Sequence, residues 1–167
     1  LLIVGDGPLL PELISYAQQK NYADRIVFLG QVESVTPYYY AADVFCLPSI
    51  YRSEAFGMVL IEAAACGLPL VSTELGTGTS YINRDGVTGL IAPPNDANAL
   101  AGALREILGS QSLRNRYGSA ARRRAAELFT QEDMGKNILN IYHQALGTKP
   151  LDMANPEEDD HSDYQPE

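Results

Sequence analysis

Two glutamates eight positions apart are the residues of this sequence best placed to do chemistry. Glu54 stands just before a helix predicted from about residue 56, and Glu62 lies two turns inside it, about 12 Å further along the axis. Gly57 lets the backbone approach a ligand, and the free N–H groups of a first helical turn favour an anion such as a diphosphate. Carboxylates accept hydrogen bonds from paired hydroxyls. The spacing therefore predicts a phosphate site between the two acids. One carboxylate would accept hydrogen bonds from the hydroxyls of a sugar and the other from those of a ribose.

A purely structural interpretation is the alternative for this pair. Glu54 would then be an exposed acid at a helix start, and Glu62 would belong to a solvated helical face. Glu62, however, lies among the apolar residues Leu60, Ile61 and Ala63, where an acid without a partner is costly. This setting favours a binding role for the pair.

Strand and helix signals alternate along the chain around these residues. Strands are predicted over 1–4, 26–29, 44–47, 70–72 and 88–92. Helices are predicted from after the 5–8 turn to about 20, over 34–42 and 56–66, from after a cap at 96 or 98 to about 108, and over 113–128 and 132–146. Either Asp96 or Asn98 is expected to cap the helix that ends near Leu108. Such alternation is typical of the α/β class, a Rossmann-like doubly wound parallel sheet with helices on both faces.

Four loops follow the predicted strands at the edge of the sheet where ligands bind in this class. They are residues 5–7, 30–32, 48–57 and 74–80, and we expect them to line one crevice. Gly5 and Gly7 lack the third glycine of a dinucleotide fingerprint, because position 10 is Leu. The Gly7 turn either only joins a strand to a helix or also borders a nucleotide. The hydroxyls of 74–80 either contact sugar or phosphate, or belong to a plain loop.

Three blocks of sequence resemble the family 4 (group 1) retaining glycosyltransferases, whose fold is the two-domain GT-B arrangement. Residues 54–62 read EAFGMVLIE, like the family's Glu-x7-Glu motif; they continue as AAACGLPLVS and are preceded at 42–49 by ADVFCLPS. The resemblance covers about residues 1–147 and implies the donor-binding half of such an enzyme. It implies that Glu54 orients the sugar, that Glu62 anchors the ribose, and that Val32 contacts the base through its backbone. Phe56, Gly57, Met58 and Val59 would then lie at the diphosphate.

The resemblance also implies an activity. A sugar would pass with retention from a nucleotide-diphospho-sugar, GDP-mannose-like or a UDP-sugar, to a glycan or lipid-linked acceptor in bacterial cell-surface polysaccharide synthesis. The departing phosphate would accept the proton, without metal or other cofactor. Residues 74–80 (ELGTGTS) are similar to the version found in mannosyl- and rhamnosyl-type enzymes, which favours a GDP-mannose-like donor.

Part of such an enzyme is expected before residue 1. The resemblance places there the acceptor-binding domain and a loop whose Arg and Lys contact the diphosphate. Residues 1–167 alone are therefore expected to bind donor weakly and to turn over little. The alternative function is a non-catalytic nucleotide-sugar binding or interaction module, and a phosphorylase-like enzyme using pyridoxal phosphate is disfavoured because no lysine lies in a suitable loop.

Charge and composition limit the partners of the chain. The formal charge of −9 over 167 residues is concentrated in 151–167, which holds seven acids and leaves −2 for 1–150. The body therefore offers no broad basic surface for nucleic acid, and the basic cluster at 122–124 is expected on a solvated helix face, with peripheral membrane association as a further option. We expect a donor-binding domain over 1–149 and an acidic, disordered tail over 150–167.

Three features of the sequence bear on where in the cell the protein acts: the length of its apolar runs, its amino-terminal residues and its cysteines. No apolar run reaches the ~20 residues of a membrane span, and no signal peptide is recognisable. Cys46 and Cys66 have no metal-ligand spacing and are expected to be buried free thiols. These features favour a cytoplasmic protein, at the inner face of the membrane if it associates peripherally.

Overall fold

The computed structural model describes residues 1–148, in which the chain forms two compact units, Leu1–Ala125 and a second that begins at Ala126. The strands are β1 (Leu2–Val4), β2 (Val27–Gly30), β3 (Phe45–Leu47), β4 (Leu70–Thr73) and β5 (Gly89–Ala92). The helices are α1 (Leu10–Gln19), the 3-10 helix η1 (Ala23–Arg25), α2 (Thr36–Ala41), α3 (Met58–Ala65), α4 (Thr79–Ile82), α5 (Ala97–Leu108), α6 (Gln111–Leu128) and α7 (Gln131–Leu146). The predicted domain limit at 149 and the predicted tail lie outside the described residues.

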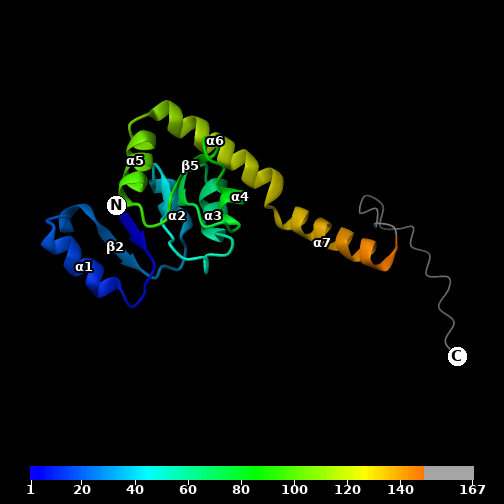
Figure 1. Cartoon of the computed structure of the whole chain (residues 1–167), viewed down its shortest axis with the longest axis horizontal. Coiled ribbons are helices and arrows are strands. Elements are labelled where there is room, and N and C mark those ends of the chain that lie inside the picture. The colour runs from blue at the N-terminus through cyan, green and yellow to red at the C-terminus, as the bar shows by residue number, and fades with distance from the viewer. Residues whose placement is uncertain (149–167) are drawn as a thin grey trace. The chain divides into compact units, whose positions relative to one another are not determined.

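All strands of the first unit pair in parallel, as predicted, but they form two sheets (Figure 1). One sheet contains β1 and β2, and the other has the order β3-β4-β5. Among the described residues no strand pairs with both β1 and β3, so the parallel strands are divided between the two sheets. The α/β class of parallel strands alternating with helices is confirmed.

Helices cover both faces of the three-stranded sheet, as alternate side chains of β4 show. Val71 packs with Ile107 of α5 and Tyr117 of α6 in one buried cluster. The next residue, Ser72, faces the opposite way and accepts a hydrogen bond from Asn83, at 2.8 Å, just after α4. Since all four residues of β4 are buried, this strand is the centre of the fold.

Asn83 forms a fully buried polar network between β4 and β5. Its amide nitrogen donates to Ser72 Oγ at 2.8 Å and to the Leu90 carbonyl at 3.1 Å, and its amide oxygen accepts from Thr88 Oγ1 at 2.9 Å. Nothing in the sequence analysis identified this residue. It satisfies buried polar groups that would otherwise be costly.

Helix ends agree with the predictions within a few residues, and the differences have local causes. Ala99 N donates to Asp96 Oδ1 at 2.9 Å, so Asp96 is the cap of α5 and Asn98 is not. Helix α3 begins at Met58, two residues later than predicted, because Gly57 has a left-handed backbone with φ of 90°. The predicted loop over 74–80 ends in a helix, since α4 starts at Thr79.

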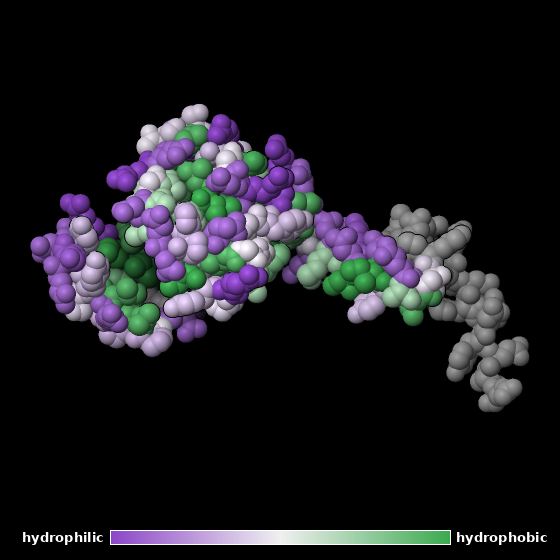
Figure 2. Space-filling model, viewed as in Figure 1, coloured by the Kyte–Doolittle hydropathy of each residue, from purple (hydrophilic) through white to green (hydrophobic). Residues whose placement is uncertain are grey.

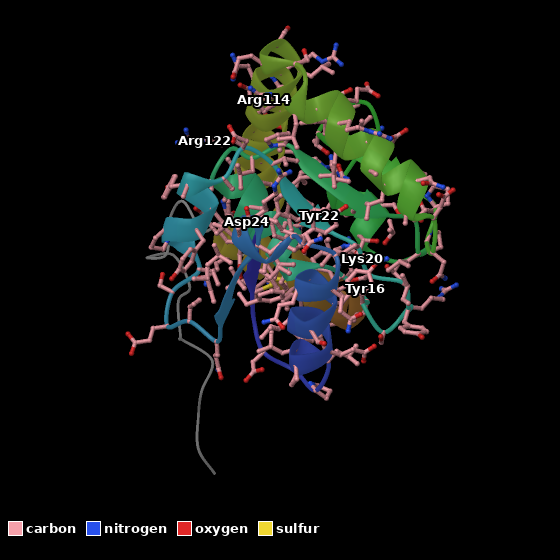
Figure 3. All side chains as sticks on the ribbon, turned by 90° about the vertical axis from the view of Figure 1, so that its left-hand side faces the viewer. Tyr16, Lys20, Tyr22, Asp24, Arg114 and Arg122 are labelled. Carbon is pink, nitrogen blue, oxygen red and sulfur yellow. The ribbon has the colours of Figure 1, made fainter. Side chains whose placement is uncertain are left out.

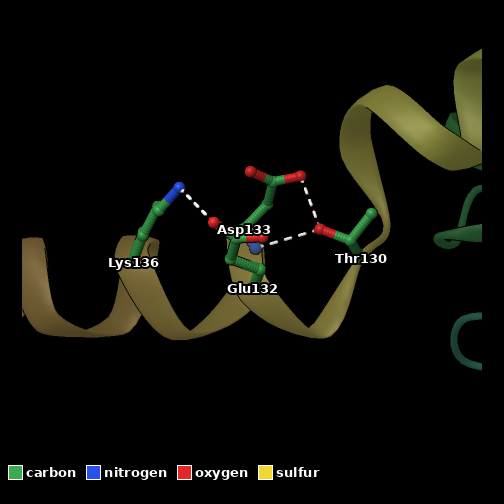
Figure 4. Close-up of polar contacts among 4 residues, drawn as sticks. All are labelled: Thr130, Glu132, Asp133 and Lys136. Atoms are coloured by element: carbon green, nitrogen blue, oxygen red, sulfur yellow. Dashed lines mark hydrogen bonds and ion pairs between the residues drawn. The ribbon is translucent and has the colours of Figure 1, made fainter. Parts of the chain in front are cut away.

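The second unit is built on helix α7. Thr130 caps it by accepting a hydrogen bond from the Asp133 N–H at 3.0 Å while its hydroxyl donates to Asp133 Oδ2 at 2.6 Å (Figure 4). Lys136 and Glu132 form an ion pair at 2.7 Å one turn later. Figure 2 shows apolar atoms on the surface of this helix, where Met134, Ile138, Ile141, Tyr142 and Leu146 are exposed.

Both cysteines are free thiols, as predicted, but they are half-buried rather than buried. Burial raises the pKa of the Cys46 thiol to about 11. Within residues 1–148, no helix combines the length and apolar character needed to cross a bilayer.

Candidate functional site

The four predicted loops all follow carboxyl ends of parallel strands. Two of them meet where β1 and β2 end, because Gly5 N donates to the Gly30 carbonyl at 2.8 Å. Gly7 lies just beyond, and its N–H donates to Asp6 Oδ1 at 2.7 Å within the turn. Val32, which follows β2, is half-buried. The structure thus brings the Gly7 turn and the Val32 turn together at one sheet edge.

The other two loops, 48–57 and 74–80, are joined by three hydrogen bonds. Thr77 Oγ1 donates to the Glu54 carbonyl at 2.9 Å, Gly78 N donates to the Ala55 carbonyl at 2.9 Å, and Arg52 Nη2 donates to the Gly76 carbonyl at 3.2 Å. Segments more than 20 residues apart in sequence therefore hold the backbone on both sides of Glu54. Sequence reasoning missed this role, because backbone acceptors carry no residue signature.

Gly78 allows the close contact between these loops. A Cβ atom at this position would lie 2.4 Å from Phe56 Cδ2 and 3.0 Å from Phe56 Cα. Any other residue must displace Phe56, which precedes Gly57 at the start of α3. Gly78 is thus a steric requirement for the path of the chain between Glu54 and the helix.

The polar hydrogens of loop 74–80 are used inside the protein. Ser80 Oγ donates to Glu74 Oε1 at 2.6 Å, and Gly76 N donates to the same oxygen at 2.8 Å. The hydrogen bond from Ser80, followed by that from Gly76, lowers the pKa of Glu74 below its ordinary value. These contacts stabilise the loop itself, and contact of its hydroxyls with sugar or phosphate stays a prediction.

The amino end of α3 lies directly after this braced loop. Gly57 is buried at positive φ, and a Cβ there would come within 3.0 Å of Leu60 Cδ1 and 3.2 Å of Thr79 Cγ2. Met58 and Val59, the first two helical residues, are exposed, and no side chain caps the N–H groups of the first turn. Glycine is therefore required at position 57 by its left-handed backbone and by the close packing of Leu60 and Thr79. The approach of a ligand to Gly57 stays a prediction.

The two glutamates differ in exposure and in partners. Glu54 is half-buried, and Glu62 is exposed. The Tyr39 hydroxyl donates to Glu62 Oε2 at 2.9 Å. The expectation that apolar neighbours surround Glu62 is wrong, because Leu60 and Ala63 are buried in the core while Glu62 is on the solvent-exposed side of the helix. Burial first, and then the hydrogen bond and charge of Glu62, raise the pKa of Tyr39 well above its ordinary value, so the hydroxyl stays protonated.

A polar hollow of about 270 Å³ lies at the opposite edge of the three-stranded sheet. Asp43 and Pro69, which line it, precede β3 and β4, and Arg114 of α6 (labelled in Figure 3) lines it as well. It is therefore remote from the carboxyl ends of the strands, and a single crevice formed by all four loops stays a prediction. Among residues 1–148, no three His, Cys, Asp or Glu side chains cluster as metal ligands would.

Comparison with known proteins matches residues 1–124 to the family described as Glycosyl transferases group 1. The chain is 41% identical over 151 residues to O-antigen chain mannosyltransferase C of Escherichia coli, covering 89% of this chain and 40% of that protein. It is 42% identical over 133 residues to D-rhamnosyltransferase WbpZ of Pseudomonas aeruginosa, covering 78% of this chain and 34% of that protein. The chain thus spans well under half the length of these relatives.

A solved structure agrees with the sequence relatives. Sucrose-phosphate synthase from Thermosynechococcus elongatus superposes with a TM-score of 0.78 at 35% identity, covering 88% of this chain and 38% of that one. The matched family covers most of the chain, including all five strands and both glutamates. The chain therefore belongs to the group 1 glycosyltransferase family.

Proposed function

We propose that this chain is the donor-binding part of a retaining glycosyltransferase that uses a nucleotide-diphospho-sugar. The observation that carries the proposal is the amino end of α3, which no side chain caps, with the braced Glu54 before it and the Tyr39-bonded Glu62 about one turn inside it. In this assignment the Met58 and Val59 N–H groups meet the diphosphate, Glu54 the sugar hydroxyls and Glu62 the ribose diol. The turns at Gly7 and Val32 border the nucleotide.

Cleavage of the bond between the anomeric carbon and the phosphate develops negative charge on the leaving diphosphate. The N–H groups and positive dipole end of α3 stabilise that charge, and this is the helix's contribution to catalysis. Glu54 and Glu62 act by orientation rather than by proton transfer. The acceptor hydroxyl attacks the anomeric carbon on the face from which the diphosphate leaves, and the leaving phosphate takes its proton. The new bond therefore keeps the configuration of the broken one, and no metal enters the proposal.

The similar proteins indicate which sugar the donor carries and in which biosynthetic process the whole protein acts. A mannosyltransferase and a D-rhamnosyltransferase both exceed 40% identity, which favours a mannose-like sugar such as that of GDP-mannose over the UDP-sugar alternative. The whole protein would act on a glycan or lipid-linked acceptor in polysaccharide synthesis. We place it in the cytoplasm, at the inner face of the membrane when it meets a lipid-linked acceptor.

The test uses the full-length protein with Glu54→Gln and Glu62→Gln, and Glu106→Gln on the exposed face of α5 as the matched control. Binding of GDP, UDP and their sugar derivatives is measured by calorimetry, and sugar transfer is measured with radiolabelled donor. Glu54→Gln is expected to reduce transfer about tenfold to a hundredfold while binding of the free nucleotide changes less than about twofold. Glu62→Gln is expected to weaken binding of both nucleotide and nucleotide sugar.

Two results would contradict this function. Wild-type transfer by both glutamate variants would leave the non-catalytic binding module as the better explanation. Substantial transfer by residues 1–167 alone would contradict the expectation that the acceptor is held outside this chain.

A further inference from the structure

Tyr39 is held in place on α2, at the centre of a run of three tyrosines. Successive helical residues differ in direction by ~100°, so the run cannot share one face, and the structure separates it as expected. Tyr39 is only 8% exposed, whereas Tyr40 is 73% exposed. The Tyr39 ring packs edge-on against Phe45 of β3, with centroids 5.6 Å apart and planes at 75°. Its hydroxyl therefore has a fixed position relative to the three-stranded sheet.

That hydroxyl reaches Glu62 on a different helix. The hydrogen bond of 2.9 Å to Oε2 joins α2 to α3 across 23 residues of sequence. A phenol has one hydrogen to donate, so it engages one carboxylate oxygen. In the part of the chain that the structure describes, no second hydrogen bond to the Glu62 carboxylate is found, and the residue itself is exposed.

An exposed glutamate has many rotamers, and binding a ligand must select one of them. A partner anchored in the core restricts the carboxylate before the ligand arrives, which reduces the ordering required on binding. Because Tyr39 uses one oxygen, acceptor sites remain on Oε2 and on Oε1 for a pair of neighbouring hydroxyls.

We infer that Tyr39 is a positioning residue, whose hydroxyl orients the Glu62 carboxylate to accept hydrogen bonds from the ribose of the donor nucleotide. This inference rests on the proposed function, since it needs Glu62 to meet the ribose. Tyr39 does not touch the ligand and acts only through Glu62.

The experiment compares ribose and deoxyribose nucleotides with full-length protein carrying Tyr39→Phe. The probes are GDP and 2′-deoxy-GDP, with UDP and 2′-deoxy-UDP in parallel, titrated by calorimetry. Tyr39→Phe keeps the ring that packs on Phe45, so the fold should be retained. We expect it to weaken binding of the ribonucleotide about fivefold and that of the deoxynucleotide less than twofold. Tyr40→Phe, the matched control on the same helix, should change neither.

Equal weakening of both nucleotides by Tyr39→Phe would overturn the inference, because a merely structural role affects both alike. No change in either would overturn it as well. Adding Tyr39→Phe to Glu62→Ala should produce no further loss, since Glu62→Ala already removes the carboxylate that Tyr39 orients.

The Glu62→Gln variant separates this inference from the proposed function. If Glu62→Gln abolishes the preference for ribose but Tyr39→Phe leaves it intact, only the role of Tyr39 is wrong. If Glu62→Gln leaves the preference unchanged, or if no nucleotide binds the wild type, the proposed function itself fails.

Discussion

The two sheets of the first unit differ in how completely they are buried. In the three-stranded sheet, β4 is buried at every position and the cluster of Val71, Ile107 and Tyr117 fills the space beneath α5 and α6. In the two-stranded sheet no residue of β1 or β2 is fully buried. Figure 2 shows apolar atoms at the surface of a hollow beside this sheet.

The polar contacts around the two sheets differ as well. Around the three-stranded sheet, the side chains of Asn83 and Thr77 make hydrogen bonds that join different strands and loops. Near the two-stranded sheet, backbone bonds such as that from Gly5 N to the Gly30 carbonyl join the segments. Side-chain contacts there are local, as where the Lys20 ammonium, directly after α1, lies 5.7 Å from the centre of the Tyr16 ring (Figure 3). The comparison indicates that one sheet supplies the rigid support for Glu54 and α3, while the other presents its turns with less support.

The largest expected difference concerns stability. Ile107 is 0% exposed, and Ile107→Ala should lower the free energy of unfolding by about 3–4 kcal/mol, because the cavity adds to the lost burial. Val27 of β2 is 50% exposed, and Val27→Ala should cost less than about 1 kcal/mol. Urea denaturation followed by circular dichroism measures both, and equal costs would refute the contrast between the sheets.

The second largest expected loss of stability concerns the buried amide of Asn83. Asn83→Ala removes hydrogen bonds to Ser72, Thr88 and the Leu90 carbonyl and leaves buried groups unsatisfied. We expect a loss of about 2–3 kcal/mol in the same denaturation experiment. Gln18→Ala, at an exposed position of α1, removes an amide side chain near the two-stranded sheet and serves as the comparison. A loss below about 1 kcal/mol for Asn83→Ala would mean that the network contributes little.

The smallest expected loss of stability tests the brace on Glu54. Gly78→Ala should cost about 1–2 kcal/mol and should also weaken binding of nucleotide sugar, because the new Cβ displaces Phe56 and the loop before α3. Gly102→Ala, on α5, is the control, since a Cβ there meets no atom within 4 Å. Unchanged sugar-nucleotide binding in Gly78→Ala would show that the position of Glu54 does not depend on this contact.

Most elements of the fold could be predicted because their signals are local. The apolar run ending at Leu47 and that starting at Leu70 mark strands, and Asp96 has the side chain and position of a helix cap. The boundary errors arose where backbone conformation decided the outcome, as with the left-handed Gly57. The short helix α4 was missed because its four residues are too few to show a helical period.

At the candidate site, the two glutamates, their spacing across a helix start and the loops after the strands follow from residue type and from the alternation of strand and helix. The bond from Tyr39 to Glu62, the contacts of Thr77 and Gly78 with the backbone at Glu54, and the division of the strands into two sheets became visible in the folded chain. These contacts join segments some 20 residues apart, often through backbone groups that every residue carries, so no local pattern specifies them.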